Sequence, residues 1–197
     1  MALCGIGTSL VNTLRRRATT DESAAVRKSS IASWLQLLNL AHRERRGEFV
    51  VSGQDISALC RLCNDASVAT RKAAAYALTK LVQANNDGEE FAAHASSLEI
   101  AWAHTVLPLV ADAEATCVVK AVKFFSVLVI EPIVELNDGA ENRVAWRILS
   151  KLSGGSNRAG ASRNASGSLI LALQKLLINA GKDSKNLAKN LLLAAYH

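Results

Sequence analysis

Apolar residues recur along this chain with the spacing of one face of an α-helix, in three segments that follow the same pattern. Each segment begins with an aspartate, and apolar residues follow 10, 13, 16 and 17 positions later; the aspartates are Asp21, Asp65 and Asp112. The residues 10 and 13 places after the aspartate are Ile31 and Trp34 in the first segment, Ala75 and Leu78 in the second, and Val122 and Phe125 in the third. Steps of three and four residues place such side chains on one side of a helix. Each segment is therefore predicted to be a helix with one buried stripe.

The aspartates are separated by 44 and 47 residues, and another apolar helical run precedes each of the three helices. These first helices are predicted at about residues 3–14, 56–63 and 100–110. A repeat of this length is typical of helical-hairpin solenoids of the HEAT and armadillo kind. One hairpin cannot bury both of its faces, so neighbouring hairpins must stack. The pattern predicts an all-α, HEAT/armadillo-like α-α superhelix, with about three hairpins and the start of a fourth in residues 1–153.

A charged pair recurs with the repeat. An arginine follows the aspartate by six residues as Asp21 and Arg27, and again as Asp65 and Arg71, whereas Val118 takes this place after Asp112. Aspartate is a preferred capping residue at the positive end of a helix. We therefore expect a structural ladder in which each aspartate caps its helix. Each arginine is expected to bond to an aspartate of its own or the adjacent repeat.

The pattern becomes looser after the third repeat. Residues 141–152 are predicted to be a helix, and residues 154–167, rich in Gly and Ser, a flexible loop. A further helical hairpin is expected over residues 168–197, with Gly181 ending its first helix and Ser184 starting its second. Solenoids need polar capping repeats at their ends. Since the chain begins and ends with apolar helices, we interpret it as part of a longer protein and its last hairpin as truncated.

Composition limits the classes of protein that need to be considered. Half of the 197 residues are hydrophobic and 5% are aromatic. The longest apolar stretch, residues 118–132, contains Lys120 and Lys123 and is too short to span a bilayer. The N-terminus lacks the organisation of a signal peptide. We therefore expect an intracellular protein without a membrane partner, whose four cysteines stay reduced.

Charge is distributed unevenly along the chain. Lys and Arg outnumber Asp and Glu by 12 to 6 in residues 1–80 and by 9 to 2 in residues 141–197, whereas residues 81–140 hold 2 against 9. Basic ends favour polyanionic partners, and an acidic middle favours a cationic one. The alternative is that long surface helices simply carry solvated charge.

Candidate chemistry is sparse. Cys60 and Cys63 have the spacing of a redox or zinc pair, but no second pair follows, and two cysteines on a helix are more often buried core thiols. The glycine-rich segment lacks a preceding strand and a Gly-Lys-Ser/Thr motif, so it does not indicate a phosphate loop. No histidine is paired with a nucleophile at an interpretable spacing. We predict no enzyme activity, no cofactor and no metal.

Basic clusters are the stronger candidates for a binding surface. Arg27-Lys28 and Arg71-Lys72 recur at one repeat offset, which would place their side chains in a row that could follow a phosphate backbone. The ladder accounts for the two arginines as structural residues but not for the lysines. The candidate DNA-binding residues are Arg15, Arg16, Arg17, Lys28 and Lys72.

Three stretches carry a family resemblance. The segment Trp102-Ala-His-Thr-Val-Leu-Pro-Leu-Val, continuing to Phe125, resembles the middle of the D3-type HEAT-repeat subunits of condensin II. Ala145-Trp-Arg-Ile-Leu-Ser-Lys-Leu-Ser-Gly-Gly-Ser156 is similar to a second stretch of that family. Residues 65–81 fit the family's Asp-x-x-Val-x-x-Arg-Lys-x-Ala repeat. The resemblance covers most of residues 55–156.

The resemblance implies a nuclear, chromosome-associated regulatory subunit without catalytic activity of its own. Its family binds a kleisin subunit that bridges a pair of SMC ATPases, contacts DNA and supports mitotic chromosome condensation. Recognition of methylated histone tails has also been ascribed to its HEAT subunits, although no aromatic cage for methyl-lysine can be assembled from this sequence. The alternative is a HEAT-repeat scaffold of another class, such as a nuclear transport receptor or a phosphatase scaffold, which would bind proteins rather than DNA.

Overall fold

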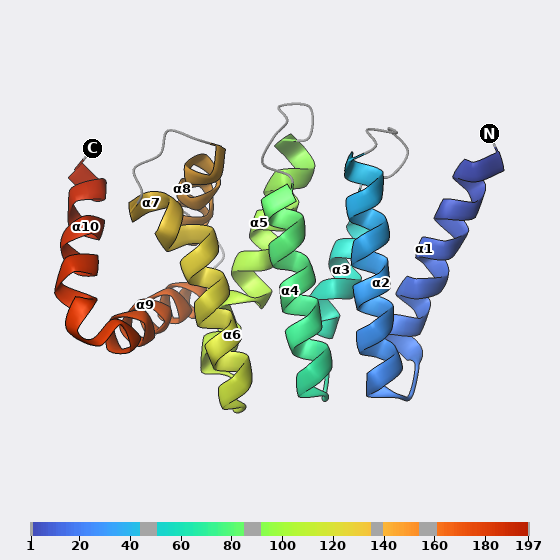
Figure 1. Ribbon diagram of the computed structural model, residues 1–197, viewed down its shortest axis with the longest axis horizontal. Coiled ribbons are helices and arrows are strands. Elements are labelled where there is room, and N and C mark those ends of the chain that lie inside the picture. Colours follow the sequence, from blue (N-terminus) through green and yellow to red (C-terminus); the bar gives the residue numbers. More distant parts are fainter. Residues whose placement is uncertain (1, 44–50, 85–91, 135–139, 154–160, 197) are drawn as a thin grey trace. The chain divides into compact units, whose positions relative to one another are not determined.

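The computed structural model describes residues 2–43, 51–84, 92–134, 140–153 and 161–196, and helices account for the regular structure in all of these ranges (Figure 1). The fold is an all-α, HEAT/armadillo-like solenoid, as the periodicity predicts. The chain divides into two compact units, Met1–Ala101 and Trp102–His197. This division lies inside the predicted repeat array of residues 1–153 rather than at its end.

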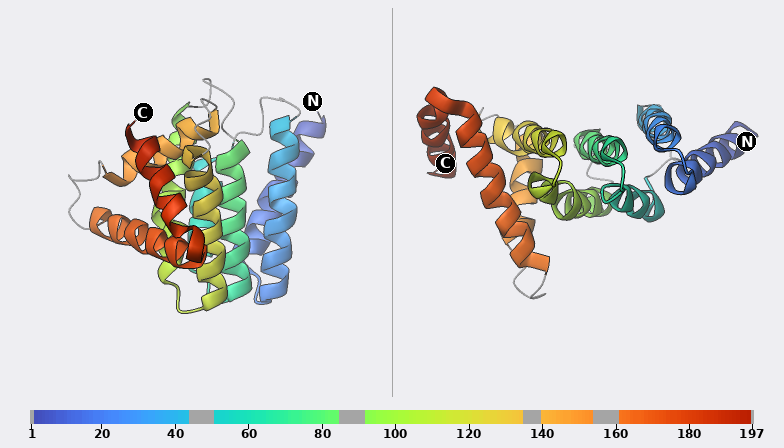
Figure 2. Two further views of the ribbon diagram at one scale, coloured as in Figure 1. Left: turned by 60° about the vertical axis from the view of Figure 1, so that its left-hand side comes forward. Right: turned by 90° about the horizontal axis from the view of Figure 1, so that it is seen from below.

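The first unit consists of two helical hairpins. They are formed by α1 (Ala2–Thr20) with α2 (Ala24–Arg43), and by α3 (Gly53–Leu62) with α4 (Val68–Ala84). Helix α2 packs against α4, and α1 packs against α3. The end-on view in Figure 2 shows the result, with α2 and α4 in one layer and α1 and α3 in the other.

The predicted stripes form the core of this unit. Ile31 and Trp34 of α2 are buried, as are Leu78 and Leu81 of α4, all at 2% exposure or less. Removing these side chains from water provides the main driving force for stacking the two hairpins. The assignment of these positions to the buried face is confirmed.

The second unit begins near the end of α5 (Ala92–Thr105), whose first residues belong to the first unit. Its remaining helical segments are η2 (Leu107–Ala111), α6 (Ala115–Phe125), η3 (Ser126–Ile130), α7 (Glu131–Val134), α8 (Ala140–Ser153), α9 (Ala161–Ala180), η4 (Gly181–Asp183) and α10 (Ser184–Tyr196). Phe125 and Leu128 are buried here as predicted, together with Val144, Ile148 and Leu152 on one face of α8.

Two prolines account for irregular turns in the second unit. The helical run predicted at about residues 100–110 is broken near Pro108, since α5 ends at Thr105 and the 3₁₀ helix η2 follows with Pro108 in its first turn. Proline has no backbone N–H and disfavours helical geometry in the residue before it. Pro132 is the second residue of α7, directly after the wider π-helical turn η3, and η3 interrupts the helix running from α6 to α7. Such turns accommodate a local break in the regular hydrogen-bond ladder.

The Gly/Ser-rich segment is only partly outside regular structure. Residues 161–167, which were expected to belong to a loop, form the first two turns of α9, while residues 154–160 lie outside the described residues. Helix propensity is a weak determinant of structure, so the Ser, Asn and Gly residues of this stretch do not prevent a helix. Gly181 ends α9 with φ of +53°, a conformation that glycine adopts without steric cost, and α10 begins at Ser184 as predicted.

Two threonines on α4 provide a matched test of the buried core. Thr70 and Thr79 are both buried, but the Thr79 hydroxyl donates to the Ala75 carbonyl at 2.8 Å, whereas the Thr70 hydroxyl has no hydrogen-bond partner among the described residues. A buried hydroxyl without a partner carries an uncompensated desolvation cost. Thr70→Val should therefore raise the free energy of unfolding by about 1 kcal/mol, whereas Thr79→Val should lower it by about 1 kcal/mol.

Chemical denaturation of the two variants beside the parent measures both changes. Valine and threonine have similar size and helix propensity, so the comparison isolates the hydroxyl. Destabilisation by both substitutions to the same extent would contradict the different environments of the two side chains.

Candidate functional site

The three repeat aspartates adopt one local structure. Each carboxylate accepts a hydrogen bond from the backbone N–H two residues later, which belongs to the residue immediately before α2, α4 or α6. The donor and acceptor residues are Ser23 and Asp21 at 3.0 Å, Ser67 and Asp65 at 2.7 Å, and Glu114 and Asp112 at 2.8 Å. The aspartates thus form Asx turns ahead of the helices instead of occupying the capping position itself, which corrects the expected geometry.

The repeat arginine joins consecutive hairpins. Nη1 of Arg27 donates to the carbonyls of Asp21 at 2.9 Å and Glu22 at 3.0 Å, within its own turn. Its Nε and Nη2 donate to the two carboxylate oxygens of Asp65 in the next turn, at 3.0 and 2.7 Å. Arg71 repeats the first half of this arrangement, donating to the carbonyls of Asp65 and Ala66. A bidentate guanidinium–carboxylate pair fixes orientation as well as distance, so this pair sets the register between the hairpins.

Electrostatics keep this pair charged. Burial alone would raise the pKa of Asp65, but hydrogen bonds from Arg27 and the Ser67 amide, with the charges of Arg27 and Arg71, outweigh burial and lower that pKa. The hydrogen bond to Asp65 in turn raises the pKa of Arg27 above its ordinary value. Asp65 and Arg27 therefore stay ionised at neutral pH, and each charge is the partner of the other within the fold.

A second ion pair joins the first helices of the two hairpins. Nη1 of Arg15 on α1 lies 2.7 Å from Oδ1 of Asp55 on α3, and its Nη2 donates to Asn12 at 2.6 Å. The other oxygen of Asp55 accepts from the amide and hydroxyl of Ser52, which completes a capping box at the start of α3. Arg15 was a candidate for DNA binding, but its guanidinium is directed into the protein because the almost fully buried Asp55 needs a cation.

Sequence reasoning did not identify Asp55. The signal was available in Ser52-Gly-Gln-Asp55, which has the spacing of a capping box. Its arginine partner could not be inferred in the same way, since 40 residues separate the two.

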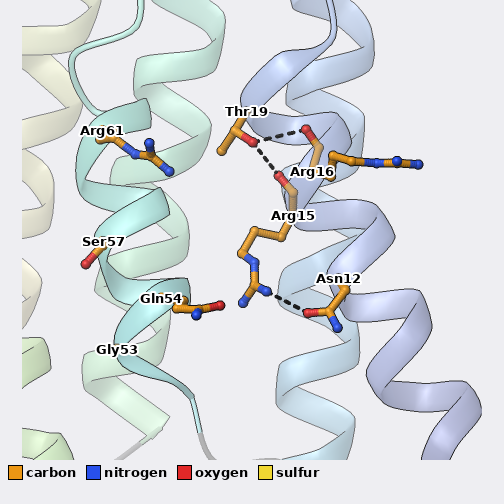
Figure 3. A pocket seen from close by; sticks show the side chains of 8 residues that line it. All are labelled: Asn12, Arg15, Arg16, Thr19, Gly53, Gln54, Ser57 and Arg61. Atoms are coloured by element: carbon orange, nitrogen blue, oxygen red, sulfur yellow. Dashed lines mark hydrogen bonds between the residues drawn. The ribbon is translucent and has the colours of Figure 1, made fainter.

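A polar groove of about 480 Å³ lies between α1 and α3 (Figure 3). Figure 3 shows the Arg61 side chain extending from α3 toward α1, whereas Arg16 extends away from α3. The lining residues, which we call the α1–α3 groove, are Asn12, Arg15, Arg16, Thr19, Gly53, Gln54, Ser57 and Arg61. Arg61 was not singled out from the sequence, because it belongs to no basic cluster and to no repeat offset.

The other basic candidates differ in their exposure. Arg16 and Arg17 near the end of α1 and Lys28 on α2 are exposed, whereas Lys72 on α4 is half-buried and has further interactions of its own. Lys28 and Lys72 occupy the same offset on two helices that pack together. The structure thus leaves Arg16, Arg17 and Lys28 as the more accessible cations of the candidate set.

The cysteines differ from the expectation in one respect. Cys63 is buried, but Cys60 is only half-buried, since residues three apart on a helix do not share one face completely. The described residues contain no group of three side chains suited to hold a metal ion. In the same ranges, no helix has both the length and the apolar character needed to cross a bilayer.

Comparison with known proteins agrees with the repeat geometry. The HEAT repeat family matches residues 56–84, which cover most of α3 and all of α4. The chain is 28% identical over 151 residues to the Condensin-2 complex subunit D3-L of Xenopus laevis. That similarity covers 75% of this chain but only 9% of the relative, so the chain spans a small part of the relative's length. No solved structure matches. The protein is thus a HEAT-repeat helical protein with distant similarity to a condensin-2 subunit.

The lowered pKa of Asp65 predicts a specific acid sensitivity. A carboxylate with a depressed folded-state pKa stabilises the protein above its unfolded pKa of about 3.9, and this contribution is lost as pH falls through the folded value. Asp65→Asn should cost about 2 kcal/mol of unfolding free energy near pH 7, because an amide replaces the charged acceptor of two Arg27 bonds. The difference from the parent should shrink progressively below about pH 5.

Urea denaturation at several pH values between 7 and 3 measures this difference. Glu22→Gln is the matched control, since Glu22 is exposed and lies in the same turn as Asp21. It should change stability by less than about 0.5 kcal/mol throughout. A constant penalty for Asp65→Asn across this pH range would show that the charge of Asp65 does not stabilise the ladder.

Proposed function

We propose that this chain is part of a non-enzymatic chromatin-binding scaffold, the regulatory HEAT subunit of a condensin II-type complex that acts in mitotic chromosome condensation. The observation that carries the proposal is the similarity to the condensin-2 complex subunit, which extends over 151 residues. The ladder of Asp21, Arg27 and Asp65 supports it, because HEAT hairpins held in a constant register present surfaces for partners. In this proposal the protein resides in the nucleus on chromosomes and binds the kleisin and SMC subunits, and ATP hydrolysis belongs to the SMC subunits.

Histone tails are a further partner in the proposal. Trp34 and Trp102 lie in the core, so neither is available to surround a methyl-lysine, whereas Tyr76 and Trp146 are 47% and 43% exposed. The acidic balance of residues 81–140 offers a basic tail its complementary charge. We therefore propose charge attraction as the main contribution to any contact with a histone tail.

Purification of the full protein from mitotic cells tests the assignment to the complex. A tag at the natural gene should recover the kleisin and both SMC subunits of condensin II in near-equal amounts, and the tagged protein should lie on mitotic chromosomes. Recovery of a transport GTPase or of a phosphatase catalytic subunit in their place would overturn the proposal and favour another class of HEAT scaffold.

We also propose that the exposed cations of the first unit contact DNA. Arg16, Arg17 and Lys28 are exposed on α1 and α2, and Lys72 lies at the repeat offset of Lys28 on α4. Arg15 is left out of this surface, because its guanidinium is engaged by Asp55. Side chains that contact phosphates contribute affinity without reading the sequence, so the expected binding is independent of DNA sequence.

The double substitution Arg17→Glu and Lys28→Glu should weaken binding to short duplexes of unrelated sequence by the same factor. The slope of log affinity against log salt should fall by about 0.9 for each phosphate contact that is lost. Fluorescence anisotropy at several salt concentrations measures both quantities. Lys80→Glu, which reverses one exposed charge elsewhere on α4, is the control for each single reversal. If the double variant and the control bind as tightly as the parent, these residues do not form the DNA surface.

A further inference from the structure

We propose that the α1–α3 groove is a docking site for an acidic peptide segment of a partner protein. This inference goes beyond the proposed function, because it depends on the geometry of the first unit and not on membership of a condensin complex. Of the exposed DNA candidates, Arg16 also lines the groove, whereas Arg17 and Lys28 do not.

The groove has an excess of positive charge. Three of its eight lining residues are arginines and none of the eight is acidic. The nearest carboxylate, Asp55, is already satisfied, since Oδ1 binds Arg15 while Oδ2 accepts from the amide and hydroxyl of Ser52. Asp55 balances the charge of Arg15, so the net positive charge of the groove comes from Arg16 and Arg61, and an anionic group that enters does not have to displace Asp55.

Arg61 provides the accessible guanidinium. It is exposed on the last turn of α3, and Figure 3 shows it extending across the groove toward α1. Within the part of the chain that the structure describes, its side chain has neither an ion pair nor a hydrogen bond. A guanidinium presents five N–H donors in a planar fork that matches a carboxylate. Arg61 can thus bind an incoming carboxylate in the bidentate manner.

Arg15 provides a second guanidinium whose position is already determined. Its two terminal nitrogens are held by Asp55 and Asn12, at 2.7 and 2.6 Å, and these bonds use only two of its five N–H groups. The remaining donors are therefore ordered before a ligand arrives, which reduces the entropy lost on binding. Arg15 thus stabilises the fold and can also complete the groove.

The size and chemistry of the groove suit a peptide segment. A volume of about 480 Å³ lies in the range of ligand pockets. From Gly53 to Arg61 the wall of α3 rises by about 12 Å, which an extended chain of about four residues would span. Figure 3 shows the amide of Gln54 directed across the groove toward the Arg15 guanidinium. Such amides can both donate to and accept from a peptide backbone.

Binding of fluorescein-labelled hexaglutamate to the full protein tests this proposal at low salt. We expect saturable binding by anisotropy, and no binding of the matched hexaglutamine peptide. Arg61→Glu should weaken hexaglutamate binding by about tenfold or more, because it replaces a bidentate donor by a repelling charge. Arg61→Gln should weaken it by a smaller factor, since the charge is removed without a new repulsion. Unchanged circular dichroism and melting temperature would establish that both variants fold.

Lys80→Glu is the matched control for charge. It makes the same change in net charge on an exposed residue of the same unit outside the groove, and it should alter hexaglutamate binding by less than about twofold. Equal weakening by Lys80→Glu and Arg61→Glu would overturn the docking site in favour of non-specific attraction. Failure of the parent to bind hexaglutamate would also overturn it. Loss of duplex DNA binding in Arg61→Glu, as large as the loss of peptide binding, would assign the groove to DNA instead.

Discussion

The bidentate contact between Arg27 and Asp65 is the interaction on which the arrangement of the first unit depends. One guanidinium holds the carbonyls of its own turn and both carboxylate oxygens of the next. Hydrophobic burial favours stacking of the hairpins but is non-directional, whereas this contact specifies one register. The Arg15–Asp55 pair adds the same kind of link between α1 and α3, and the register places the walls of the α1–α3 groove opposite each other.

Some basic side chains of the first unit form ion pairs within the fold, and only the others can bind a partner. Arg15 and Arg27 are largely buried beside carboxylates, and replacing either would leave a carboxylate without its partner. Arg61 and Lys28 are exposed, so a charge reversal there removes attraction for an anion with little effect on the core. This separation makes the groove and the proposed DNA surface testable independently of each other and of folding.

The third repeat shows that the Asx turn of the ladder can form without the arginine. Asp112 retains the Asx turn of its counterparts, although Val118 replaces the arginine at the repeat offset. The Asx turn is local and needs only the aspartate and a nearby N–H, whereas the arginine serves a contact with a neighbouring repeat. The second unit also contains the turns imposed by Pro108 and near Pro132, and its helices depart accordingly from the simple hairpin pattern.

The sequence by itself determined the helices, the buried stripe that includes Trp34 and Leu78, and the end of a helix at Gly181, because periodicity and backbone preference act over a few residues. It also indicated that the repeat aspartates and arginines are structural. Only the tertiary structure decided that Arg15 belongs to Asp55, since the pair joins residues 40 positions apart and a basic cluster looks the same whether its side chains turn inward or outward. For the same reason the position of Arg61 opposite α1 could not be predicted: a groove exists only when two helices have packed.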